Sequence, residues 1–239
     1  MEKHLYPSPG EVIRNLADFF IDTVHRAIQR SGNASVVVSG GSSPKQLFEL
    51  LATPNYKSRI DWSRISFFFA DERYVPADHP EYNGGMVKQS LFDPLMIDAN
   101  KVFYINTSLS PEKSAEEYSN VISDFFQSKP LHFDLVLLGL GDDAHTASLF
   151  PGTIILEEPG TLVRAVNVER LGADRITLSS NLINQAETVC FLVYGSSKSS
   201  AVQKVITGER DYQQYPAQLI QPQSGNLHWF MDEAAAAKL

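Results

Sequence analysis

Residues 133–152 read FDLVLLGLGDDAHTASLFPG, and this stretch indicates both the fold class and the place of the chemistry. Residues 133–138 are apolar apart from one aspartate, which is typical of a strand that is buried on both faces of a parallel sheet. Glycines then end the strand without side-chain bulk, and Asp142, Asp143 and His145 follow. Because ligands bind at the carboxyl ends of strands in such sheets, these three residues are candidates for chemistry. The spacing alone also fits a turn with a solvated aspartate pair and a surface histidine.

Segments typical of strands and of helices alternate along the 239 residues. Short apolar runs predict strands, and an apolar residue at every third or fourth position predicts helices. We expect strands over residues 34–38, 65–70, 102–105, 133–138, 161–168, 188–193 and 227–231. We expect helices to begin near residues 9, 45, 83, 111, 181 and 196, with one more over the alanine-rich end. This alternation predicts an α/β fold with a doubly wound, mainly parallel sheet, helices on both faces, and a single domain over residues 1–239.

Capping residues mark where several of these helices begin. Ser8, Pro9 and Glu11 fit the cap, the first position and the capping box of the first helix. The chain before the strand at residues 34–38 therefore reads as one helix. Ser43 is expected to cap the helix over residues 45–52, and Asp232 is expected to cap the last helix.

Composition and charge exclude several classes of protein. The formal net charge of −8 at pH 7 argues against general nucleic-acid binding, which needs a basic face. No apolar run approaches the ~18 residues that a membrane span requires. The single cysteine, Cys190, lies inside an apolar run, so we expect a buried core residue and no disulfide within the chain. With no signal-peptide pattern at the start, we expect a cytoplasmic monomer that binds a small molecule and neither nucleic acid nor membrane.

A second informative stretch, SGGSSP, joins the strand expected at residues 34–38 to the helix that follows it. Glycines allow a backbone to come close to a ligand, and the free N–H groups of a helix start attract anions. The stretch has neither the Gly-Lys-Ser/Thr of a Walker A loop nor a G-x-G-x-x-G pattern, and it fits an ordinary strand-to-helix turn equally well. The candidates for phosphate binding in this turn are Ser39, Gly40, Gly41 and Ser42.

Cationic residues follow other expected strands. Arg73 comes after the strand at residues 65–70, where it is able to bind an oxyanion through two hydrogen bonds or to join a salt-bridge cluster. Lys198 lies at a helix start, where a positive charge is unfavourable unless an anion lies nearby; a solvated surface lysine is the alternative. Arg170 and Arg175 flank a short turn and are further candidates for binding an anion.

Three stretches taken together, at residues 39–44, 71–73 and 139–152, resemble the 6-phosphogluconolactonase family, which belongs with glucosamine-6-phosphate isomerase/deaminase in one superfamily. The resemblance extends over nearly the whole chain, through residues 175–178, 216–219 and 229–232. The sequence HTASLFP after Ala144 is similar to the lactonase branch. The deaminase branch instead has His-Ile-Ala-Phe-Asn-Glu-Pro, with a glutamate that is absent here. Ala144 departs from the family, which has glycine there, and its methyl group would constrain the loop if its φ is positive.

The resemblance implies a Rossmann-like fold of the sugar-phosphate isomerase/lactonase type. It also implies the hydrolysis of 6-phospho-D-glucono-1,5-lactone to 6-phospho-D-gluconate in the oxidative pentose phosphate pathway. His145 is then the general base, Asp143 orients its imidazole, and Arg73 serves either the oxyanion or the phosphate. The turn at residues 39–42 and Lys198 are expected to hold the phosphate, with the other two arginines as further candidates.

The resemblance implies no cofactor and no metal, although Asp142, Asp143 and His145 have side chains of the kind that bind metals. Two alternatives remain open. One is a glucosamine-6-phosphate isomerase or deaminase, against which the missing glutamate argues. The other is a non-catalytic sugar-phosphate sensor domain, which usually carries a DNA-binding helix-turn-helix that the acidic chain lacks.

Overall fold

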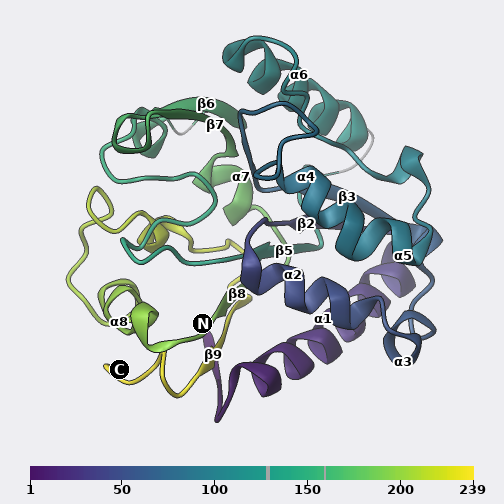
Figure 1. Cartoon of the computed structure of the whole chain (residues 1–239), viewed down its shortest axis with the longest axis horizontal. Helices are drawn as coiled ribbons and strands as arrows, with labels where there is room; N and C mark the ends of the chain where they lie inside the picture. Colours follow the sequence, from purple (N-terminus) through teal and green to yellow (C-terminus); the bar gives the residue numbers. More distant parts are fainter. Residues whose placement is uncertain (128–129, 159) are drawn as a thin grey trace.

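A parallel sheet of six strands lies at the centre of the molecule (Figure 1). The computed structural model describes residues 1–127, 130–158 and 160–239. The strands lie in the order β1-β9-β8-β5-β2-β3, and each neighbouring pair is parallel. Their bounds are β1 (Glu2–Tyr6), β2 (Ala34–Val38), β3 (Ile65–Phe69), β5 (Leu135–Leu138), β8 (Val189–Val193) and β9 (Leu227–Asp232). The predicted α/β fold with a mainly parallel, doubly wound sheet is confirmed.

Burial explains why most of these strands are recognisable in the sequence. Every residue of β2, β3, β5, β8 and β9 is buried, which accounts for their nearly continuous apolar runs. Cys190 lies in β8 as a buried free thiol, as predicted, and burial raises the pKa of that thiol.

Helices cover the sheet and connect its strands. Their bounds are α1 (Pro9–Ser31), α2 (Ser42–Leu51), α3 (Pro54–Lys57), α4 (Asn83–Val87), α5 (Asp93–Leu95), α6 (Pro111–Phe126), α7 (Ser180–Asn184) and α8 (Ser199–Ile206). A π-helical turn covers Lys88–Phe92, and 3-10 turns cover Trp62–Arg64, Ala99–Lys101, Ile154–Glu157, Glu169–Leu171, Ser196–Lys198 and Pro216–Leu219. Helix α1 packs against β1, β2, β8 and β9, whereas α6 lies across the sheet from it in Figure 1. Among the described residues, no helix combines the length and the apolar composition that crossing a membrane requires.

The predicted cap of α1 is confirmed. The Ser8 hydroxyl accepts a hydrogen bond from the Glu11 amide at 3.4 Å, and Gly32 ends the helix in the left-handed conformation with a φ of 81°. The cap predicted for α2 is wrong. Gly41, with a φ of 105°, is the residue before the helix, so Ser43 lies inside the first turn. A positive φ costs little energy only for glycine. Gly41 therefore serves as the residue before the helix, and α2 begins at Ser42 and not after Ser43.

A second, smaller sheet contains three antiparallel strands in the order β4-β7-β6, namely β4 (Asp71–Arg73), β7 (Ala173–Leu178) and β6 (Val163–Val168). The sequence pattern predicts the strand near residues 161–168 but not its separation from the main sheet. In the register of this small sheet, Asp71 lies opposite Thr177 and Arg73 lies opposite Arg175. The sheet therefore carries residues 71–73 away from the end of β3 and turns them toward β7.

Three further expectations about secondary structure are wrong. Residues 102–105 form only one bridge, between Val102 and Phe67, because their apolar side chains serve packing: the Phe103 ring stacks on Phe68 with centroids 4.5 Å apart. Residues after Asp232 form turns and no helix, although the Asp232 carboxylate accepts from the Ala235 amide as a helix cap would, and it also accepts from the amide of Gly195. The chain before β2 contains β1 in addition to the helix, and β1 is an edge strand with exposed side chains.

Candidate active site

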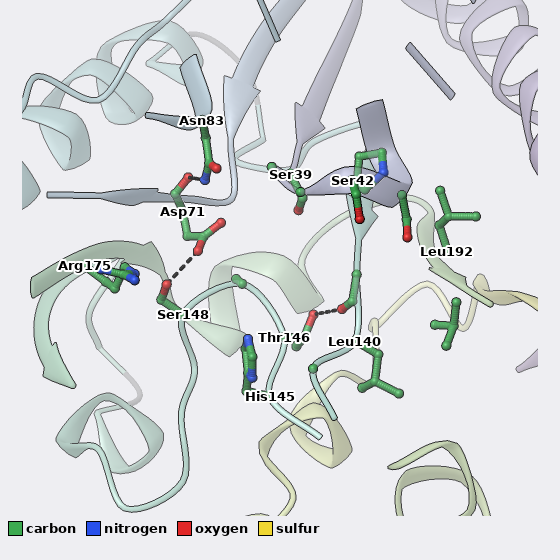
Figure 2. Close-up of a pocket in the computed structure, with 18 of the residues that line it drawn as sticks. Ser39, Ser42, Asp71, Asn83, Leu140, His145, Thr146, Ser148, Arg175 and Leu192 are labelled. Atoms are coloured by element: carbon green, nitrogen blue, oxygen red, sulfur yellow. Dashed lines mark hydrogen bonds between the residues drawn. The ribbon is translucent and has the colours of Figure 1, made fainter. Parts of the chain in front are cut away.

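A cleft of about 410 Å³ lies where β2, β5 and β8 end, between the main sheet and the small sheet (Figure 2). The structure brings most of the predicted site residues together in its lining: Ser39, Gly40, Gly41, Ser42, Arg73, His145, Arg175 and Lys198. Asp143 does not line the cleft but lies behind His145. The side chain of Arg170 lies outside the described part of the chain. Parallel strands thus deliver distant stretches to one edge, as the general rule for such sheets predicts.

His145 and Asp143 form a hydrogen-bonded pair. The ring atom Nδ1 of His145 contacts Oδ1 of Asp143, and the same oxygen accepts from the His145 amide at 3.2 Å. The imidazole also stacks on Phe150, with centroids 4.1 Å apart and an angle of 29° between the planes. Because Nδ1 is committed to the carboxylate, Nε2 is the ring atom able to exchange a proton with a ligand in the cleft.

The loop around His145 has a tight backbone. The amide of Gly141 donates to the carbonyl of His145 at 2.8 Å. A Cβ on Gly141 would lie 2.0 Å from Nδ1 of His145, so only glycine allows the ring to take this place. Ala144 and Ala147 have positive φ angles of 64° and 48°. The positive φ that was considered for Ala144 is present. Its backbone is in the left-handed region, which costs an alanine roughly 1–2 kcal/mol relative to the usual conformations.

The turn between β2 and α2 presents the amino end of α2 to the cleft. The Ser39 hydroxyl donates to the carbonyl of Leu137 at 2.8 Å, so this side chain ties β2 to β5. A Cβ on Gly40 would lie 1.8 Å from Oδ1 of Asn83, so this glycine makes room for a protein side chain as well as for a ligand. The first N–H groups of α2 and the helix dipole together make this end attractive to an anion.

Glu72 fixes the wall of the cleft next to that turn. Its buried carboxylate accepts from the amides of Asn83 and Arg73, each at 2.7 Å, and from the amide of Gly84 at 2.8 Å. These bonds satisfy the start of α4, which has no capping side chain of its own. Burial raises the pKa of Glu72 to about 8, against the opposing effect of the three amides and with a smaller contribution from Asp71. Sequence reasoning gave Glu72 no role, because its partners lie on another element.

Two arginines face one another beside the cleft. Arg73 of β4 and Arg175 of β7 are directly opposite in the register, and both line the cleft. Burial and the nearby charge of Arg73 lower the pKa of Arg175, although a guanidinium stays protonated in proteins. Like charges directly opposite on adjacent strands are destabilising. An anion bound between them would relieve that repulsion, so the pair supports an anion site.

Lys198 ends the 3-10 turn Ser196–Lys198, directly before α8, and lines the cleft from another side. Its Nζ lies 2.7 Å from Oδ1 of Asp142, whose side chain is largely exposed. The anion expected near this lysine is thus present in the protein itself. Asp142, a candidate for chemistry in the sequence, is in the structure the partner of a cation.

Sequence reasoning missed several residues of the cleft. The Ser148 hydroxyl donates to Oδ2 of the buried Asp71 at 2.6 Å, and the Thr146 hydroxyl donates to the Gly139 carbonyl at 2.8 Å (Figure 2). These bonds hold the loop that follows His145 against β4 and against the end of β5. The signal for Asp71 in the sequence was its place in the charged run at residues 71–73, directly after a strand, whereas Ser148 had no such signal.

Comparison with known proteins places these features in a family. The sequence model of the family described as glucosamine-6-phosphate isomerases/6-phosphogluconolactonase matches residues 7–229. A 6-phosphogluconolactonase of Synechocystis sp. is 41% identical over 220 residues, covering 90% of this chain and 89% of the relative. Another, of Nostoc sp., is 38% identical over 237 residues, covering 98% and 96%.

Solved structures agree with the sequence relatives. The 6-phosphogluconolactonase of Trypanosoma cruzi superposes with a TM-score of 0.89 at 26% identity, covering 100% of this chain and 96% of that one. The 6-phosphogluconolactonase of Thermotoga maritima superposes with a TM-score of 0.84 at 27% identity, covering 97% and 99%. A monomeric glucosamine-6-phosphate deaminase, at 18% identity and a TM-score of 0.84, shares the fold. From the match over residues 7–229 and these relatives, we conclude that the chain belongs to the glucosamine-6-phosphate isomerase/6-phosphogluconolactonase family.

Proposed function

We propose that this protein is a 6-phosphogluconolactonase, which hydrolyses 6-phospho-D-glucono-1,5-lactone to 6-phospho-D-gluconate, and that His145 is its general base. The observation that carries the proposal is the His145–Asp143 pair at a cleft that is also lined by Arg73, Arg175 and Lys198. A proton acceptor beside a cationic cleft suits an anionic substrate whose carbonyl is attacked by water. The relatives at 38–41% identity carry the same name.

The chemical step follows from this arrangement. Nε2 of His145 takes a proton from a water molecule while the water oxygen bonds to C1 of the lactone, and the carbonyl electrons move to the carbonyl oxygen. The tetrahedral adduct then collapses, the bond between C1 and the ring oxygen breaks, and His145 returns the proton to that oxygen. Asp143 holds the imidazole by Nδ1 and stabilises the imidazolium that forms between the two steps.

The phosphate end of the substrate is assigned to the start of α2 and to Lys198. The N–H groups at the start of α2 and the lysine line the same cleft, and Lys198 changes partner from Asp142 to the phosphate. Arg73 and Arg175 supply the remaining positive charge. An Arg73→Ala variant tells apart the two roles considered for Arg73. Loss of a contact to the oxyanion lowers kcat, whereas loss of a contact to the phosphate raises KM.

The proposal also covers the domain organisation, the cellular compartment and the oligomeric state of the enzyme. The described apolar core is one cluster shared by both sheets, which supports one domain over residues 1–239. We place the enzyme in the cytoplasm as a monomer, and gel filtration with light scattering tests the monomer.

The test is an assay of acid release from freshly generated 6-phosphogluconolactone, corrected for spontaneous hydrolysis. We expect turnover that saturates with substrate, and a kcat/KM at least about 100-fold lower for unphosphorylated glucono-1,5-lactone, since charge-assisted contacts would be lost. Release of ammonia from glucosamine 6-phosphate, with no effect on the lactone, would assign the protein to the deaminase branch. Equal kcat/KM for both lactones would exclude phosphate recognition in the cleft.

A further inference from the structure

The pairing of β1 with β9 brings two histidines and a glutamate together far from the cleft. Side chains two residues apart on a strand share a face, so Glu2 and His4 lie on the same face of β1. The register places His228 of β9 directly beside Glu2. These residues lie at the starts of their strands, whereas the cleft lies at the carboxyl ends of the parallel sheet. The cluster is therefore separate from the site already described.

The distances within this cluster are close to those between ligands of one metal ion. Nε2 of His4 lies 3.1 Å from Nδ1 of His228, and the Glu2 carboxylate lies 3.6 Å from Nδ1 of His228 and 3.9 Å from Nε2 of His4. Tetrahedral zinc with bonds of about 2.0–2.1 Å holds its ligand atoms ~3.3 Å apart. The two imidazole nitrogens are already close to that spacing, and the Glu2 side chain is exposed and able to rotate toward them.

The surroundings hold both imidazoles in place. The His4 ring stacks on Phe230 at 4.3 Å between centroids, and the His228 ring packs against Phe19 of α1 at 4.6 Å. A hydrogen bond between the two ring nitrogens requires one donor and one acceptor, so one of them gives up its proton, or passes it to the other nitrogen of its ring, when both rings bind a metal.

A cavity of about 360 Å³ opens beside Glu2 and His228 and leaves room for a water molecule as a fourth ligand. Of the two arginines that line this cavity, Arg30 pairs with the carboxylates of Asp134 and Glu187, and Arg26 donates to the neutral Thr23 hydroxyl. Among the described residues, Glu2 supplies the carboxylate that lies within 4.8 Å of both imidazoles. Two imidazoles and a carboxylate are ligands typical of zinc.

We propose that Glu2, His4 and His228 bind one zinc ion, which fastens the edge strand β1 to β9. The ion is structural and takes no part in the reaction at His145, so this proposal stands independently of the proposed function.

The test uses untagged, full-length protein stripped of metal with EDTA and then dialysed against a small excess of zinc chloride. We expect about one equivalent of bound zinc by elemental analysis, and a visible absorption band of tetrahedral type when cobalt(II) is used instead. Thermal unfolding should shift upward by about 5–10 °C at roughly 100-fold excess of zinc over its Kd. Lactone hydrolysis should be the same with and without EDTA.

Matched variants locate the ion. His228→Asn and Glu2→Gln should each lose the bound zinc and its thermal shift, whereas His25→Gln and His79→Gln, which change exposed histidines elsewhere, should keep both. Circular dichroism and lactonase activity report whether each variant is folded. The proposal is overturned if the wild type holds no zinc after dialysis, or if His145→Ala rather than His228→Asn removes it.

Discussion

The molecule contains two clusters of histidine and carboxylate at opposite ends of one sheet, and they differ in what holds them. His145 and Asp143 lie on a loop after β5, where neighbouring alanines have positive φ angles. His4 and His228 lie on paired strands, where the register alone sets their separation. The loop places one imidazole with a ring nitrogen left for a ligand, whereas the strands bring two imidazoles together.

The charges around the two clusters also differ. The cleft at His145 is lined by Arg73, Arg175 and Lys198. These positive charges favour an anionic substrate and disfavour the binding of a metal cation. At the other end Arg30 is paired with two carboxylates, and Arg26, bonded to a neutral hydroxyl, is the one arginine in the cavity lining that keeps its charge. The same residue types therefore suit proton transfer at one end and metal binding at the other, and the difference comes from backbone and charge.

The largest expected effect comes from removing one histidine of each cluster and comparing the activities of the two variants. His145→Ala should lower kcat on the phosphorylated lactone by about 10²–10⁴-fold, the usual contribution of a positioned general base, with KM little changed. His228→Asn is the matched change at the other end, and its kcat should stay within about twofold of wild type. Steady-state kinetics of both variants, corrected for uncatalysed hydrolysis, measure this. Near wild-type kcat in His145→Ala would mean that another group is the base.

A second prediction concerns the loop geometry that distinguishes the two clusters. Gly141→Ala should lower kcat by about 10²-fold, because the added Cβ would lie 2.0 Å from Nδ1 of His145 and must displace the ring. Gly139→Ala is the control in the same loop, since nothing lies within 4 Å of its Cβ position. Its kcat should change by no more than a few-fold. Equal decreases in kcat for the two variants, with normal circular dichroism, would show that Gly141 is not needed to position the His145 ring.

The third prediction sharpens the contrast in charge. Lys198→Ala should raise KM for the phosphorylated lactone about 10- to 100-fold, as expected for loss of a charge-assisted hydrogen bond. Asp142→Asn should instead lower KM about twofold, because it frees the lysine from a largely exposed ion pair. Neither change should affect KM for unphosphorylated lactone. A rise in KM for both lactones in Lys198→Ala would place the lysine at the sugar ring.

The last prediction concerns stability and comes from the rigid wall of the cleft. Glu72 has a pKa raised to about 8 in the folded protein from an ordinary value of 4.5, so the folded state binds its proton more tightly. Its contribution to stability is complete below pH 4.5 and is lost as pH rises toward 8, at up to about 1.4 kcal/mol per pH unit.

Urea unfolding of wild type and Glu72→Gln between pH 5 and pH 8 checks this, because glutamine cannot ionise. The difference in the free energy of unfolding should move in favour of the variant as pH rises. A constant difference across that range would show that the Glu72 carboxylate is ionised throughout.

The sequence predicts the elements whose burial is complete. Strands β2, β3, β5, β8 and β9 are apolar throughout because both faces are covered, and their carboxyl ends meet at one edge. Those two facts are sufficient to predict that His145, Lys198 and the turn after β2 lie together, whereas Arg73 reaches the cleft through the small antiparallel sheet.

What the sequence does not predict depends on partners distant in the chain. Strand β1 has mostly exposed side chains, and only its pairing with β9 makes it a strand. The bonds of Glu72 to the start of α4 and of Lys198 to Asp142 leave no periodic pattern. Residues 102–105 show the opposite case, since their apolar run serves aromatic packing and not a sheet ladder.

The pairing of β1 with β9 also has a consequence for how the chain reaches its native state. His4 and His228 are 224 positions apart, so β1 is synthesised long before its partner β9 exists. Until then β1 is an unpaired edge, and its three charged or ionisable side chains, Glu2, Lys3 and His4, discourage pairing with other chains. This edge of the sheet is thus completed only after β9 has been made, when two segments synthesised far apart in time meet.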